Sequence, residues 1–160
     1  MTDPVHADIA RDLIDTNNYL VLGTADAAGT PWVSPVFYVH RDYRDFYWAS
    51  APTTRHSHNV AVRPDIGIAI YDSHSPVGHA EAVYLAARAA LVPNDELEHT
   101  AAIYNSRLPG QKQFDPAALR PPALLRLYRA TAIEHSVLVR GGDPRYGRGA
   151  DSRITVTIQP

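Results

Sequence analysis

Cysteine is absent from the 160 residues of the chain, which excludes disulfide bonds and thiolate metal sites. Lysine is nearly absent: Lys112 is the only one, and the remaining basic side chains are arginines. The formal net charge is −2, whereas a nucleic-acid binder usually carries a basic excess. We therefore expect no nucleic-acid partner, while the charge balance still allows a local arginine pocket for one phosphate.

Long hydrophobic runs are also missing. No run of about 18 apolar residues occurs, so no membrane-spanning helix is expected. Residues 1–5 do not combine a basic stretch with an apolar one, so they do not resemble a signal peptide. With the absence of cysteine, these features predict a cytoplasmic protein without a membrane partner.

The bulk composition is that of an ordinary globular chain. Hydrophobic residues make up 45% of it and charged residues 20%. No repeat, low-complexity tract or internal linker interrupts the sequence. A single domain spanning residues 1–160 is the expectation that fits this length.

The N-terminal segment is typical of a helix. Asp3 can cap the first turn, and Pro4 suits the first helical position. Val5, Ile9 and Leu13 recur at a spacing of four, which predicts one apolar stripe. The helix is expected to end at residues 17–18.

Two more helices are predicted further along the chain. Residues 53–63 form a short candidate that Pro64 closes. Asn94 can cap another helix, with acidic residues in its first turn. The apolar face of that helix comprises Leu97, Ala101, Tyr104 and Leu108. One further helical turn is expected after Asp115 and Pro116.

About seven strands alternate with these helices. They are predicted over residues 19–25, 31–40, 46–50, 65–71, 81–92, 124–140 and 154–158, the sixth bent near Thr131. Many short strands with turns between them favour a closed barrel over a sandwich or an open sheet. Both faces of 31–40 are apolar, so a partner subunit or helix is expected to cover this strand.

The segment from Pro31 to Tyr71 combines a phosphate trap with an aromatic slot. Arg55 offers a fork of donors that matches phosphate oxygens. The hydroxyls of Thr53, Thr54 and Ser57 can add hydrogen bonds. A helix that begins near residue 53 also presents free backbone N–H groups and a positive dipole end.

This segment, best over residues 19–72 and more loosely over 5–140, resembles the flavin-binding split-barrel family that includes pyridoxamine 5′-phosphate oxidase. The resemblance implies a mainly β, Greek-key split barrel that pairs as a homodimer with flavin at the seam. It places the flavin ring along the second strand and the phosphate at the turn before the short helix. The implied cofactor-binding residues are Ser34, Pro35, Val36, Phe37, Trp48, Ser50, Thr53, Thr54, Arg55, His56 and Asn59.

The sequence departs from pyridoxamine 5′-phosphate oxidase itself at three points. His56 stands where the family's phosphate motif usually has lysine, and Ser34 where the oxidase has a phosphate-binding arginine. The oxidase's C-terminal substrate motif is not recognisable in residues 152–158. We therefore expect a related oxidoreductase that acts on a different small molecule.

The leading hypothesis from the sequence is an FMN-dependent oxidoreductase that transfers hydride through flavin N5. The cofactor then carries the chemistry while the protein positions it, and no catalytic side chain is identified. A rival hypothesis is a reductase that uses the deazaflavin F420, although a single lysine offers little for its acidic tail. A non-catalytic flavin or heme carrier would use the same barrel. An oligonucleotide-binding barrel is disfavoured by the charge balance.

The remaining chemistry-bearing residues form no specific motif. His56, His58, His74 and His79 lack the HExxH spacing, so no metal site is predicted. No GxSxG elbow supports serine hydrolysis. The long strand contains His135, which we interpret as a barrel or interface residue. Residues 141–151 form a glycine- and arginine-rich surface loop, not a P-loop, and its arginines are candidates to close over an anion.

Overall fold

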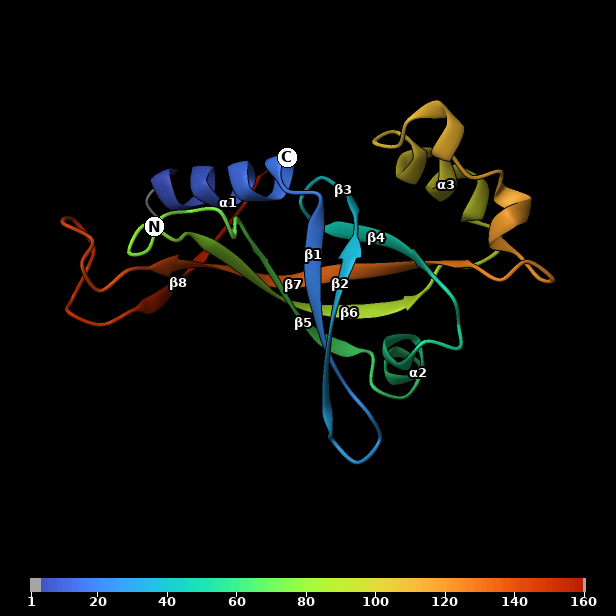
Figure 1. Ribbon diagram of the computed structural model, residues 1–160, viewed down its shortest axis with the longest axis horizontal. Coiled ribbons are helices and arrows are strands. Elements are labelled where there is room, and N and C mark those ends of the chain that lie inside the picture. Colours follow the sequence, from blue (N-terminus) through green and yellow to red (C-terminus); the bar gives the residue numbers. More distant parts are fainter. Residues whose placement is uncertain (1–3, 160) are drawn as a thin grey trace.

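One continuous antiparallel sheet of eight strands forms the centre of the protein (Figure 1). The computed structural model describes residues 4–159. The helices are α1 (Pro4–Thr16), α2 (Arg55–Val62) and α3 (Leu97–Asn105), with short 3-10 turns at Gly110–Lys112 and Pro116–Leu119. The strands are β1 (Tyr19–Ala25), β2 (Pro31–Phe37), β3 (Val39–Arg41), β4 (Asp45–Ser50), β5 (Asp65–Tyr71), β6 (Ala82–Leu91), β7 (Arg126–Val139) and β8 (Ser152–Val156).

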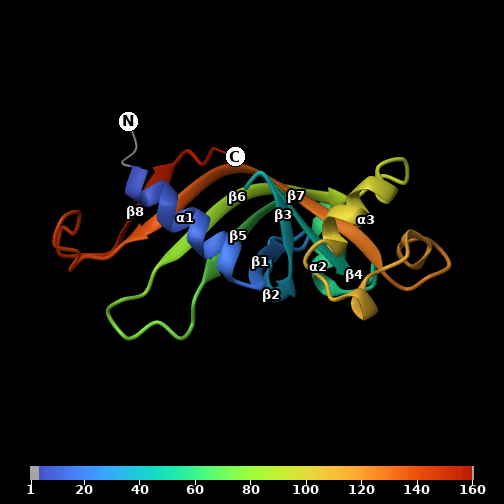
Figure 2. The same cartoon turned by 90° about the horizontal axis from the view of Figure 1, so that it is seen from above.

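The strand order makes the fold a split barrel. Neighbouring strands follow the order β2-β1-β5-β6-β7-β4-β3, and β8 pairs with residues 135–139 of β7. The sheet curls strongly, as the view from above shows (Figure 2). The mainly β split barrel that was expected is confirmed, with one helix before β1 and others after β4 and β6.

The strand predicted over 31–40 is in fact two strands, which explains why there are eight and not seven. β2 pairs only with β1, and β3 pairs with β4. Between them Tyr38 makes no ladder pair; its backbone N–H instead donates to Asn18 O at 3.2 Å. The predicted burial of this segment on both faces is not seen in β2 of the single chain, where Val33 is 64% exposed. Val39 of β3 is buried.

The main core fills the concave side of the sheet. Its largest buried side chains include Trp48 and Phe46 of β4, Tyr128 of β7 and Tyr38, and α1 adds Ala10, Leu13 and Ile14 where it packs against β5, β6, β7 and β8. The predicted stripe of α1 was wrong in part, since Val5 is 41% exposed. The buried face of α1 does not follow the predicted stripe, because the helix crosses several strands at once. The predicted cap Asp3 lies outside the described residues.

A second core lies on the convex side, beneath α3. Leu97, Ala101 and Tyr104 bury there as predicted. The predicted cap at Asn94 was wrong: the residue before α3 is Glu96, so the helix begins at Leu97, two residues later than expected. Residues 94–96 form a turn, because the Glu96 carboxylate pairs with Arg129 of β7 and fixes the chain before the helix begins.

Two smaller differences concern the last strands. β6 and β7 shift register between Ala86 and Ala87, which leaves Ile133 of β7 as an extra, unpaired residue. This bulge supplies the bend that was expected near Thr131. β8 begins at Ser152, two residues earlier than predicted, because it pairs with residues 135–139 of β7.

Replacing Tyr38 by phenylalanine should destabilise the fold. The Tyr38 hydroxyl is fully buried and donates to Ile14 O at 2.6 Å, at the end of α1. Losing that donor leaves a buried carbonyl unpaired, so the free energy of unfolding should fall by about 1–3 kcal/mol. Urea denaturation measures this.

The matched control for Tyr38→Phe is Tyr19→Phe, because Tyr19 is 62% exposed. The control should change the free energy of unfolding by less than about 0.5 kcal/mol. Equal effects of the two substitutions would contradict the anchoring role of the Tyr38 hydroxyl.

Candidate functional site

The split in the barrel lies between β2 and β4. β2 pairs only with β1, and β4 pairs with β3 and β7, so these two strands approach without a hydrogen-bonded ladder. Tyr38 closes one end of the split, and α2 lies at the other end (Figure 1). Backbone polar groups on the free edge of β2 therefore face the split without a strand partner.

Helix α2 begins at Arg55 because Thr54 caps it. The Thr54 hydroxyl accepts from Ser57 N at 3.4 Å, and the extended backbone of Thr54 ends the preceding loop. The helix starts two residues later than predicted. Its first backbone N–H groups, those of Arg55 and His56, have no acceptor within the helix.

Hydrogen bonds from Asn59 and Arg63 hold α2 against the β1–β2 hairpin. Asn59 Nδ2 donates to the Thr24 hydroxyl at 3.0 Å, and both residues are buried. Arg63 donates to the carbonyls of Asp26 and residue 27, at 2.8 and 3.2 Å. Asn59 is thus buried between α2 and β1, where it positions the helix.

Arg55 lies flat on Trp32 at the start of β2. The guanidinium carbon is 4.3 Å from the ring centroid, a cation–π distance. Trp32 Nε1 in turn donates to the Ser34 hydroxyl at 3.0 Å, which fixes the indole. The three residues form a short chain along β2, with Arg55 exposed at the start of α2.

His56 turns away from that edge and joins a network of hydroxyls. Its Nε2 lies 2.8 Å from Ser50 Oγ and 3.2 Å from Thr54 Oγ1, and the Thr54 and Ser57 hydroxyls are 2.8 Å apart. Burial lowers the pKa of His56 below its usual value of 6.5. His56 is therefore neutral at pH 7 and links β4 to α2, whereas Arg55 carries the positive charge.

The predicted residues of β2 divide between its two faces. Val36 packs against the main core, whereas Phe37 packs edge-on against Tyr104 of α3 at 6.0 Å. Pro35 is exposed on the outer face beside Val21. What Ser34 to Phe37 share is the backbone edge of the strand, and that their backbone groups border a flavin ring stays a prediction.

Trp48 and Thr53, also predicted for the site, differ in their burial. The Trp48 side chain is fully buried and stacks on Tyr128 with ring centroids 5.6 Å apart. It shapes the wall of the barrel and exposes nothing to the split. Thr53 is exposed at the turn before α2, next to the residues that could hold a phosphate.

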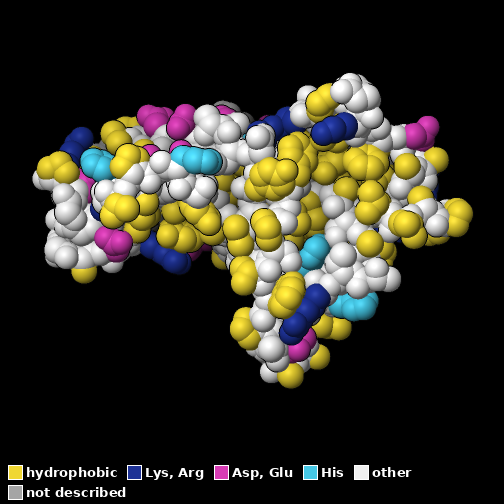
Figure 3. Space-filling view, viewed as in Figure 1, with side chains coloured by type: hydrophobic (Ala, Val, Ile, Leu, Met, Phe, Trp, Pro, Cys, Tyr) yellow, Lys and Arg dark blue, Asp and Glu magenta, His cyan; other side chains and the backbone are white. Residues whose placement is uncertain are grey.

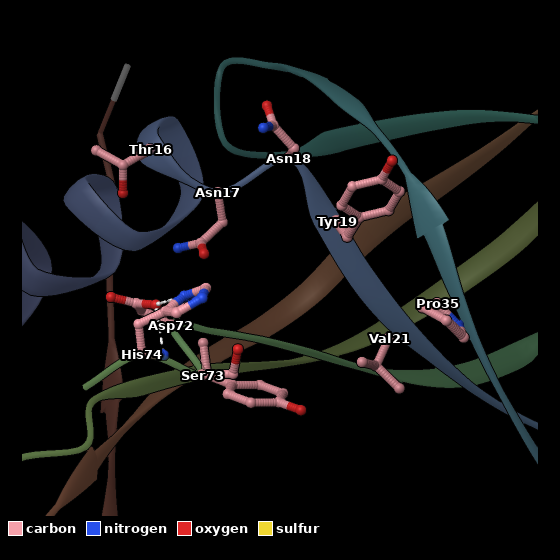
Figure 4. A pocket seen from close by; sticks show the side chains of 10 residues that line it. Thr16, Asn17, Asn18, Tyr19, Val21, Pro35, Asp72, Ser73 and His74 are labelled. Atoms are coloured by element: carbon pink, nitrogen blue, oxygen red, sulfur yellow. Dashed lines mark hydrogen bonds and ion pairs between the residues drawn. The ribbon is translucent and has the colours of Figure 1, made fainter. Parts of the chain in front are cut away.

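A pocket of about 520 Å³ opens on the outer face of β1 and β2 (Figure 4). Tyr19, Val21 and Pro35 form its apolar side, and the segment after β5 forms its polar side. There the Asp72 carboxylate accepts from His74 N at 2.8 Å and lies 3.2 Å from His74 Nδ1. Sequence patterns gave no signal for this pocket, because its residues come from three separate segments.

The remaining histidines do not gather around a metal. Among residues 4–159, no group of three or more histidine, aspartate or glutamate side chains is arranged to hold an ion. His135 lies in β7 as expected, and its Nε2 is 2.7 Å from Tyr43 O in the β3–β4 turn. In the same described range, none of the helices has the length and apolar character that crossing a membrane requires.

Two of the solved structures with this fold are described as binding different cofactors. A heme-binding protein from Mycobacterium smegmatis is 21% identical, with a TM-score of 0.69, over 97% of this chain and 60% of that protein. A Clostridium acetobutylicum protein of the pyridoxinephosphate oxidase family, related to general stress protein 26, is 13% identical over 97% of both chains, with a TM-score of 0.67. An FAD-binding protein from Mesorhizobium loti is 18% identical over 79% of this chain and 89% of that one, with a TM-score of 0.61.

The fold is that of a split barrel in which α2 lies across one end of the open edge. The family comparison identifies the family to which this split barrel belongs. The family model of pyridoxamine 5′-phosphate oxidase matches residues 7–134. The chain therefore belongs to the pyridoxamine 5′-phosphate oxidase family. No match was found among curated proteins. The chain spans 60% of the length of the Mycobacterium smegmatis protein.

Acidification should destabilise the protein below about pH 6.5. Burial lowers the pKa of His40, His56 and His135 below 6.5, so the unfolded chain binds protons before the folded one does. The free energy of unfolding therefore falls as the pH drops from 6.5 toward the lowered values. Urea denaturation across this range measures the slope.

Replacing His56 by glutamine should make that slope shallower, since one of the three imidazoles with a lowered pKa is removed. His74→Gln is the control, because the His74 side chain is 94% exposed. A slope that is unchanged in His56→Gln would contradict the buried, neutral state of His56.

Proposed function

We propose that this protein is a flavin-dependent oxidoreductase that binds FMN in the split between β2 and β4. The observation that carries the proposal is the start of α2, where Arg55 stacks on Trp32, the Ser50 and Thr54 hydroxyls gather at His56, and two backbone N–H groups have no acceptor in the helix. Membership of the pyridoxamine 5′-phosphate oxidase family and an FAD-binding structural neighbour support it.

The residues present fit the phosphate end of such a cofactor. Arg55 supplies a planar fork, and its stacking on Trp32 limits its freedom before a ligand binds. The Ser50 and Thr54 hydroxyls and the N–H groups of the first turn of α2 add neutral donors. When bound, flavin supplies hydride transfer at N5, while these groups hold it in place.

The site is proposed to be completed by a second copy of the chain. The outer face of the β1–β2 hairpin exposes large apolar side chains: Tyr19 is 62% and Val33 64% exposed. Figure 3 shows hydrophobic side chains across this face and into the hollow between the lobes that contain α2 and α3. Burying them in a homodimer would remove an unusual apolar surface from water and cover the flavin.

Replacing Arg55 by alanine should weaken FMN binding without unfolding the protein. Loss of a charge-assisted pair with phosphate costs about 1.5–3 kcal/mol, which corresponds to at least roughly a tenfold rise in Kd. Flavin fluorescence titration of the apoprotein measures it. Arg88→Ala is the control, because Arg88 is an exposed side chain that pairs with Asp65 elsewhere on the sheet. Equal affinity in both variants would remove Arg55 from the site.

Replacing Val33 by aspartate should convert the dimer to monomers and weaken flavin retention. A charge buried at an apolar interface is costly unless it finds a partner. Light scattering coupled to gel filtration gives the oligomeric state. Val77→Asp is the control, because Val77 is fully exposed in the β5–β6 loop. A monomeric wild-type protein that retains flavin would contradict the proposed seam.

A heme-binding role is the second candidate. It is favoured by the position of His74, whose Nδ1 lies 3.2 Å from Asp72 at the rim of an aromatic pocket, so that Nε2 remains for iron. One structural neighbour is a heme-binding protein. The absorption spectrum of the purified protein decides between the two: oxidised flavin bands support the first candidate, and a Soret band that His74→Ala shifts supports the second.

A further inference from the structure

A second polar pocket lies at the opposite end of the sheet from α2, where α1, β8 and the loop after β7 meet (Figure 1). Its volume is about 430 Å³. Three arginines, His6 and Tyr146 contribute to its wall, and among residues 4–159 no acidic side chain does. The proposed flavin site does not use any of these residues.

The acidic residues of the loop are occupied in folding it. The Asp143 carboxylate accepts from the backbone N–H groups of Arg145 and Tyr146, at 2.9 and 2.8 Å. The Asp151 carboxylate accepts from Gly141 N at 2.9 Å and so joins the two ends of the loop. The loop is therefore a shaped turn whose carboxylates do not line the arginine-rich pocket.

Two of the arginines have no carboxylate partner. No ion pair within residues 4–159 involves Arg148 or Arg153. Arg153 lies over the Tyr84 ring with its guanidinium carbon 3.7 Å from the centroid, which holds the group flat. Among the described residues no carboxylate neutralises either of these side chains, while Asp143 interacts electrostatically with the neighbouring His6.

His6 gives independent evidence for a ligand. The residue is 3% exposed, lines the pocket and packs edge-on against Tyr146, with ring centroids 4.5 Å apart. Its Nδ1 is buried and has no hydrogen-bond partner in the described part of the chain. A buried imidazole nitrogen without a partner is rare, because such a group pays its desolvation cost without compensation.

We propose that this pocket binds a phosphate group, either free or as part of a small phosphate ester. Arg148 and Arg153 provide planar forks that match a tetrahedral oxyanion. His6 lines the same wall, and its imidazole can supply one more donor through the nitrogen that faces the pocket. The volume exceeds what a phosphate alone needs and leaves room for the remainder of a small ester.

The test is an NMR titration of the Arg55→Ala protein with inorganic phosphate and, separately, with glycerol phosphate. The Arg55→Ala background removes the proposed flavin-phosphate site, so this test can fail without affecting that proposal. Saturable shifts confined to the amides of His6, Tyr146 and residues 147–153 are expected. Tighter binding of the ester would identify it as the better ligand, and equal binding would identify the free anion.

Arg148→Gln and Arg153→Gln should each weaken this binding about tenfold or more, as expected for the loss of one charge-assisted contact. Arg88→Gln serves as the matched control and should leave it unchanged, because Arg88 is paired with Asp65 outside the pocket. Shifts that chloride reproduces at equal ionic strength would overturn the proposal. So would loss of flavin from the Arg153→Gln variant of the otherwise wild-type protein, because the two sites would then not be separate.

Discussion

The constraint on which the structure depends is the passage of the chain through Tyr38. β2 and β3 lie at opposite ends of the strand order, yet only this residue separates them in the sequence. The sheet must therefore curl until its two ends meet. The buried hydroxyl of Tyr38 on Ile14 O and its backbone bond to Asn18 O pin this meeting point to the end of α1.

The same crossover creates the candidate site, because strands that meet only at one end leave a split between them. Helix α2 spans the other end of the split and connects Ser50 of β4 to Trp32 of β2 through His56 and Arg55. The two adjacent side chains have different tasks. Arg55 remains a charged donor, while His56, kept neutral by burial, ties the helix to β4. The site that we propose for the flavin phosphate thus combines one permanent cation with neutral donors.

Arginine and an aromatic ring are paired at both ends of the molecule. Arg55 lies on Trp32 beside the split, and Arg153 lies on Tyr84 beside the pocket of the last loop. Stacking orders the flat guanidinium while its N–H edge stays available, so less side-chain entropy is lost when an anion binds. The chain has a single lysine, so its basic side chains are almost all arginines. The ammonium group of lysine is not planar, so it cannot stack on a ring and present two parallel donors as a guanidinium does.

Local periodicity was enough to predict most elements, because alternation, capping residues and turn residues act over short stretches of chain. The family followed from the resemblance of residues 19–72 to a known fold, and the role of Arg55 stays a prediction. The sequence by itself thus determined a mainly β barrel with helices after its third and fifth predicted strands. Only the tertiary structure decided that residues 31–40 divide at Tyr38, that α3 starts after Glu96, that Trp48 is a core residue and that His56 faces Ser50. Each of these depends on a partner far away in the sequence or on the packing around it, and no local pattern encodes such a partner.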